Sequence, residues 1–129
     1  MDGGEVFNFS ISKEPKSIKE LLKFSDKNLD EIDYIFFHQA NAYILTSIAK
    51  KLNINLEKVP LQSLSKYGNT SSASIPLAIC DFFDTSLRNN INVILSGFGV
   101  GLSFASVSLT LNKDILLKVD KFNIKDKYE

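Results

Sequence analysis

The sequence is poor in the residues that build disulfides and metal sites. It contains one cysteine, Cys80, and one histidine, His38, among 129 residues. A single cysteine excludes an internal disulfide framework and a cysteine-rich zinc site, and it is typical of a reducing compartment. No metal-ligand spacing surrounds the lone histidine, so we expect neither a metal nor another cofactor.

The sequence also lacks an excess of either charge and any long apolar run. Fifteen basic residues balance fifteen acidic ones, and no basic stripe is visible. We therefore expect neither nucleic acid nor an anionic membrane as a partner. No apolar run approaches the roughly 18 residues of a membrane span. The start, MDGGEVFNFS, lacks the charged and apolar regions of a signal peptide, so we expect a soluble cytoplasmic protein.

The apolar residues that are present suffice for a folded core. They make up 44% of the chain, and ten of them are phenylalanine. This composition argues against disorder, and the length favours one domain. We place that domain at residues 1–112. The lysine-rich residues 113–129 are interpreted as a C-terminal extension, either a mobile tail or an added edge strand.

Hydrophobic patterning predicts strands that alternate with helices. The expected strands are residues 5–12, 34–37, 59–64, 92–99 and 102–111. The expected helices are about residues 15–24, with Pro15 first, 41–52, with Asn41 as cap, and 70–90. Glycines 97, 99 and 101 indicate a tight turn between the last two strands. This pattern predicts an α/β fold, with a mixed sheet that packs against helices and ends in an antiparallel strand pair.

His38, Asn69 and Asn41 are candidates for a site. His38 directly follows the strand at 34–37, at the strand end where open α/β sheets form their sites. From position alone it is either a site residue or a partly buried structural histidine. Asn69 and Asn41 each precede a predicted helix, so each is either a helix cap or an amide that contacts a ligand oxygen.

Two other features have ordinary structural interpretations. The stretch GFGVG at 97–101 does not have the G-x-G-x-x-G spacing of a nucleotide site, and a strand rather than a helix follows it. It is either a simple hairpin turn or a turn whose backbone N–H groups face an oxyanion. Cys80 lies inside the predicted helix among apolar neighbours, which favours a buried, inert thiol.

Three motifs together are more specific than any one of them. HQAN at 38–41, YGNTSSASIPLA at 67–78 and SGFGVGLSFASVSL at 96–109 occur in this order. They resemble the C-terminal part of β-ketoacyl-acyl-carrier-protein synthase III, a thiolase-like condensing enzyme, over about residues 1–111. The resemblance implies a thiolase-like half-domain of an acyltransferase of fatty-acid biosynthesis. That enzyme joins an acyl thioester to malonyl-acyl-carrier-protein by decarboxylative Claisen condensation.

The resemblance also implies roles for individual residues. Enzymes of this family use a Cys-His-Asn triad, in which His38 matches the histidine and Asn69 the asparagine. Cys80 does not match the nucleophile, which belongs to the N-terminal half, so this chain alone is expected to be inactive. Asn41 matches an asparagine near the active site. The resemblance assigns the pocket aromatic to Phe98 and the oxyanion-hole turn to Phe98, Gly99 and Val100.

The implied partners are acyl carrier protein, acyl-CoA or acyl-carrier-protein substrates, and a second copy in a homodimer. Tyr43 replaces an arginine that is linked to carrier docking in many family members. Lys50 and Lys51 match basic positions on the same face and are candidates for that docking, with solvated helix lysines as the alternative. Two other functions remain open: a non-catalytic binding or dimerisation module of the same fold, and a related condensing enzyme that acts on coenzyme A thioesters.

Overall fold

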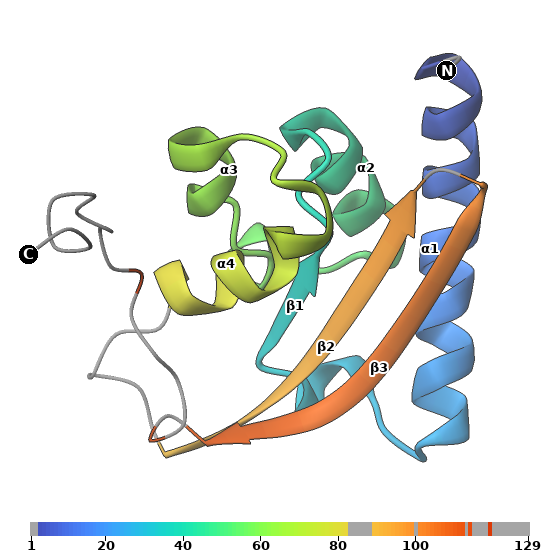
Figure 1. Ribbon diagram of the computed structural model, residues 1–129. Coiled ribbons are helices and arrows are strands. Elements are labelled where there is room, and N and C mark those ends of the chain that lie inside the picture. Colours follow the sequence, from blue (N-terminus) through green and yellow to red (C-terminus); the bar gives the residue numbers. More distant parts are fainter. Residues whose placement is uncertain (1–2, 83–88, 100, 113, 115–118, 120–129) are drawn as a thin grey trace, which may run out of the picture.

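Figure 1 shows the protein as a computed structural model in which helices pack against a small sheet. The structure describes residues 3–82, 89–99, 101–112, 114 and 119. The α-helices are α1 (Gly3–Phe24), α2 (Ala42–Leu52), α3 (Gln62–Tyr67) and α4 (Ser74–Phe82). The strands are β1 (Tyr34–Phe37), β2 (Asn90–Gly99) and β3 (Ser103–Asn112). Short 3₁₀ helices lie at Leu29–Glu31, Leu56–Lys58 and Ser71–Ala73.

The three strands form one mixed sheet in the order β1-β2-β3. β1 runs parallel to β2, with Phe37 opposite Ser96, and β3 runs antiparallel to β2. The predicted α/β class and the closing antiparallel pair are therefore confirmed. The confirmed strand predictions are those at residues 34–37, 92–99 and 102–111.

Apolar clusters lie on both faces of this sheet, because successive side chains of a strand point in opposite directions. On one face, Phe37 and Ile94 pack with side chains of α1 and α2. On the other face, Phe36 and Val93 pack with side chains of α4. Figure 1 shows the parallel strands β1 and β2 ending at the same edge of the sheet. The loops that follow these two strands are thereby brought together.

Helix α1 corrects the prediction for the N-terminal segment. Residues 5–12 were expected to form a strand and Pro15 to start a helix, but a single helix covers Gly3–Phe24 with Pro15 inside it. Of the five buried positions of α1, all but Pro15 recur every four residues, as on one face of a helix: Ser10, Glu14, Ile18 and Leu22. Two of these four are polar. Because Ser10 and Glu14 are polar, the apolar residues alone do not show the helical period, which appears only when the buried positions are known.

The segment before α4 differs from its prediction in two places. Residues 59–64 were expected to be extended, but α3 begins at Gln62 within them. The helix expected at about 70–90 begins as 3₁₀ turn at Ser71 and becomes α4 at Ser74. Residues 83–88 lie outside the described part, and Asn90 already belongs to β2.

The glycine turn and Cys80 also need correction. Gly97 and Gly99 lie within β2 rather than in the turn, where Gly101 has a positive φ of 82°. Cys80 is partly exposed rather than buried.

The predicted extension at 113–129 lies almost wholly outside the described residues, so its boundary stays a prediction. In the part of the chain that the structure describes, no helix has the length and apolar character needed to cross a membrane.

Candidate active site

A pocket of about 730 Å³ opens at the edge where β1 and β2 end. Its lining brings together residues far apart in the sequence: His38 after β1, Asn69 before α4, and Phe98 and Gly99 at the end of β2. Val100 lies outside the described residues. The two residues that the motifs predicted as a pair, His38 and Asn69, therefore share one cavity.

His38 is held at the pocket by its backbone and by its ring. Its N–H donates to the Ser96 carbonyl at 2.8 Å, which continues the pairing of β1 with β2. Its Nδ1 lies 2.7 Å from Ser74 Oγ. The ring stands edge-on to Phe98, with centroids 5.5 Å apart and planes at 88°. These contacts hold the imidazole by one ring nitrogen and by one edge.

The electrostatic surroundings of His38 favour its neutral form. Burial lowers the pKa of the imidazole below its usual 6.5, and a hydrogen bond with the backbone of Ser71 acts in the opposite direction. Because burial is the larger effect, the pKa of the ring is lowered and its neutral form is favoured over the charged form. A neutral imidazole has one N–H to donate and one nitrogen to accept.

Asn69 follows a backbone bend that only glycine adopts readily. Gly68 has φ 70° and ψ −158°, a region closed to side-chain-bearing residues. After the bend, Asn69 Oδ1 accepts the Ser71 N–H at 2.9 Å. Within the described residues the Nδ2 group has no hydrogen-bond partner, and Asn69 lines the pocket. The two interpretations of Asn69 are thus compatible, since its oxygen caps the turn and its nitrogen can donate to a ligand.

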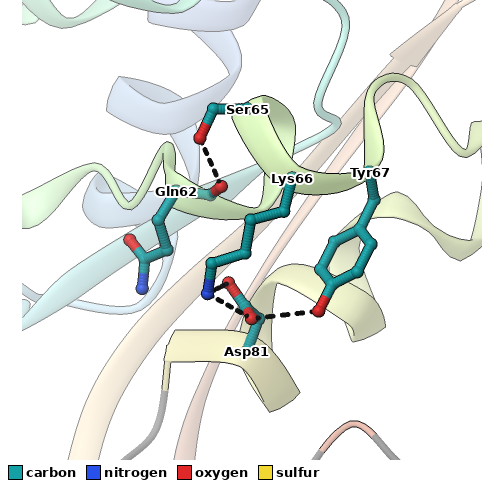
Figure 2. A network of polar contacts seen from close by, with 5 residues as sticks. All are labelled: Gln62, Ser65, Lys66, Tyr67 and Asp81. Carbon is teal, nitrogen blue, oxygen red and sulfur yellow. Dashed lines mark hydrogen bonds and ion pairs between the residues drawn. The ribbon is translucent and has the colours of Figure 1, made fainter. Parts of the chain in front are cut away.

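A second set of contacts holds the Asn69 loop from outside the pocket (Figure 2). Lys66 Nζ contacts both carboxylate oxygens of Asp81, at 2.7 and 3.0 Å. The Tyr67 hydroxyl donates to Asp81 Oδ1 at 3.3 Å. Lys66 and Tyr67 end α3, directly before Gly68, whereas Asp81 lies on α4. The two helices that flank the Asn69 loop are therefore tied together.

Sequence reasoning missed Ser74, Gln39 and Asp81. Ser74 and Gln39 are buried beside His38, and the Gln39 side chain donates to the carbonyls of Phe37 and Pro60. Both residues stand inside the motifs quoted above, and their motif position was the only available signal. Asp81 had no such signal, because its partners precede it by 14 and 15 residues.

The remaining candidates do not line this pocket. Asn41 is exposed, and its Oδ1 accepts the Ile44 N–H at 2.9 Å, which confirms the predicted helix cap. Lys50 and Lys51 lie in the last turn of α2 and face different grooves, Lys50 beside Tyr43 and Lys51 beside α1. Their roles stay predictions. Among the described residues, no group of His, Cys, Asp and Glu side chains is arranged to hold a metal ion.

Comparison with known proteins decides the family. Residues 22–111 match the family described as 3-Oxoacyl-[acyl-carrier-protein (ACP)] synthase III C terminal. The chain belongs to this family. That match contains the His38 and Asn69 motifs and both strands that end at the pocket.

Curated relatives cover the same region. A β-ketoacyl-[acyl-carrier-protein] synthase III from Streptococcus gordonii is 40% identical over 114 residues, which are 86% of this chain and 35% of the relative. A putative 3-oxoacyl-[acyl-carrier-protein] synthase 3 from Campylobacter jejuni is 41% identical over 118 residues, which are 92% of this chain and 32% of the relative. The chain thus spans about a third of the length of these synthase III relatives.

Solved structures show the same fold. A 3-oxoacyl-(acyl-carrier protein) synthase from Burkholderia xenovorans superposes with a TM-score of 0.82 at 38% identity, covering 92% of this chain and 34% of that one. A synthase III from Pseudomonas aeruginosa also gives 0.82, at 34% identity, over 88% of this chain and 36% of that one. The predicted thiolase-like half-domain is therefore confirmed.

Proposed function

We propose that this chain is the C-terminal part of a 3-oxoacyl-acyl-carrier-protein synthase III and supplies two catalytic side chains, His38 and Asn69. The observation that carries the proposal is their convergence on one pocket from different loops of the fold. Each side chain has a nitrogen that can donate, the imidazole of His38 in its neutral form and Nδ2 of Asn69. Two neutral donors suit an oxygen on which negative charge develops during a reaction.

In the proposed reaction an acyl group is first held as a thioester on a cysteine, and malonyl-acyl-carrier-protein then binds and loses carbon dioxide. The electrons of the broken carbon–carbon bond move into an enolate, whose oxygen gains negative charge. His38 and Asn69 stabilise that oxygen by hydrogen bonds that strengthen as the charge grows. Removing one preorganised donor of this kind typically raises the barrier by about 3 kcal/mol, or roughly a hundredfold in rate.

Carbon–carbon bond formation requires a second reactant, the acyl group held as a thioester on a cysteine. The enolate carbon attacks the acyl carbonyl, and the tetrahedral intermediate then releases the cysteine thiolate. Backbone N–H groups of the segment Phe98–Gly99–Val100 are proposed to stabilise the oxyanion of that intermediate. Cys80 does not line the pocket, so this chain provides no nucleophile and is expected to be inactive alone.

The wider setting of the enzyme is proposed on the same basis. We infer an acyltransferase of fatty-acid biosynthesis that works in the cytoplasm with acyl carrier protein as a partner, docked in part by Lys50 and Lys51. Exposed apolar side chains on β3, Phe104 at 42% and Val107 at 48% exposure, support association with further protein. We propose that these side chains are covered by the rest of the enzyme and by a second copy in a homodimer.

The test uses protein expressed from the complete reading frame and an assay of condensation with malonyl-acyl-carrier-protein. His38→Ala and Asn69→Ala are each expected to lower kcat by roughly a hundredfold or more. Asn8→Ala makes the same chemical change at an exposed position of α1 and should leave kcat unchanged. Near-normal condensation by either site variant would refute the assigned roles, and turnover by the 129-residue chain alone would refute the half-enzyme proposal.

A further inference from the structure

The hydroxyl of Ser74 connects His38 to the start of α4. Ser74 is the first residue of that helix and is 2% exposed. Its Oγ lies 2.7 Å from His38 Nδ1 and also accepts the backbone N–H of Gln39 at 3.3 Å. One oxygen is thus bound to the imidazole and to the backbone of the very next residue. The ring is therefore fixed relative to its own main chain.

The direction of these bonds follows from counting hydrogens. A backbone N–H can only donate, so Ser74 Oγ is the acceptor in its contact with Gln39. The hydroxyl hydrogen then needs an acceptor of its own, and in the described structure the other bonded neighbour of Oγ is His38 Nδ1. If Nδ1 carried the proton, Oγ would accept twice and its buried hydrogen would have no acceptor, which is unfavourable. The arrangement that satisfies both hydrogens at Ser74 Oγ has the hydroxyl donating to Nδ1.

We propose that Ser74 is a positioning residue that fixes the tautomer of His38, with the ring proton on Nε2. The catalytic meaning of this rests on the function proposed above, since only the Nε2–H tautomer can donate to an enolate oxygen from the ring nitrogen that Ser74 does not contact. The other tautomer would present a lone pair at Nε2 and repel that oxygen. Ser74 would then act on the reaction without touching the substrate.

The tautomer can be measured directly, without an activity assay. Protein from the complete reading frame is labelled with ¹⁵N-histidine, and the His38 ring signals are identified by their loss in His38→Asn. We expect the wild-type ring to carry its proton on Nε2. Ser74→Ala should populate both tautomers, whereas Ser74→Thr, which keeps the hydroxyl, should restore Nε2–H. Ser65→Ala removes an exposed hydroxyl on α3 and should change nothing.

A second measurement separates positioning from loss of structure. In the same protein, Ser74→Ala should lower the rate of malonyl decarboxylation by roughly tenfold or more. The rate at which the cysteine is acylated should stay within twofold, because that step does not use the His38 donor. A wild-type ring protonated on Nδ1, an unchanged tautomer in Ser74→Ala, or an equal loss in both steps would overturn the proposal. Failure of the proposed function would appear instead as an active His38→Ala variant, whatever the tautomer.

Discussion

Glu14 offers a sharp test of the packing of α1 against the sheet. The residue is fully buried in the middle of α1, and Ser96 of β2 donates a hydrogen bond to its Oε2. Its Oε1 has no partner among the described residues. Burial raises the pKa of this carboxyl from 4.5 to about 7, although the hydrogen bond from Ser96 acts against the rise. Between pH 4.5 and about 7, Glu14 is therefore protonated to a greater extent in the native protein than in the unfolded chain.

The sign and size of the effect follow from that difference in pKa. Between pH 4.5 and about 7 the native state binds more protons at Glu14 than the unfolded state, so the free energy of unfolding falls as the pH rises. Each pKa unit corresponds to about 1.4 kcal/mol, and the rise from 4.5 to about 7 therefore amounts to about 3 kcal/mol. This loss is complete above the native pKa. Below the unfolded pKa the stabilisation is fully present.

The assay is urea denaturation at several values of pH from 4.5 to 8.5. Glu14→Gln keeps the shape of the side chain but cannot ionise, so its stability relative to wild type should improve by about 3 kcal/mol across this range. The difference between the two proteins is the proper measure, because His38 gives wild type an opposing slope. Its pKa is lowered by burial, so protonation of the unfolded chain costs stability as the pH falls below 6.5.

The control is Glu20→Gln, which makes the same change on α1 at a side chain that is 66% exposed. The difference in free energy of unfolding between Glu20→Gln and wild type should vary far less with pH. A difference between Glu14→Gln and wild type that stays constant from pH 4.5 to 8.5 would refute the reasoning. It would mean that Glu14 ionises in the native protein as it does in water.

Two further predictions concern the Asn69 loop. Gly68→Ala should lower the free energy of unfolding by about 1–3 kcal/mol, because Gly68 has a positive φ that alanine adopts with strain. Gly99→Ala is the control and should not lower it, since the space around the added carbon is equally open and no positive φ is recorded there. Equal effects of the two in urea denaturation would contradict this. Asp81→Asn should lower the thermal midpoint by a few degrees, because it removes the charge that faces Lys66, and Tyr67→Phe should lower it less. An unchanged midpoint in Asp81→Asn would show that the contact does not stabilise the fold.

Local pattern was enough to predict much of the fold and the centre of the site. The run at 34–37, the apolar spacing of α2 and its Asn41 cap are determined by neighbouring residues, so sequence reasoning found them. The motifs around His38 and Asn69 were equally visible, and the structure brings both residues to one pocket. Their catalytic roles stay predictions.

What the sequence by itself determined are the features whose causes lie within a few residues. The tertiary structure decided those in which a polar group finds its partner far along the chain. The apolar pattern gave no reason to expect Glu14 to be buried, and the folded chain supplies Ser96, 82 residues later, to donate its hydrogen bond. Ser74 reads as one of several small residues until His38, 36 residues earlier, is placed against it. A buried polar side chain is stable only when its partner is in place, and only the folded chain puts it there.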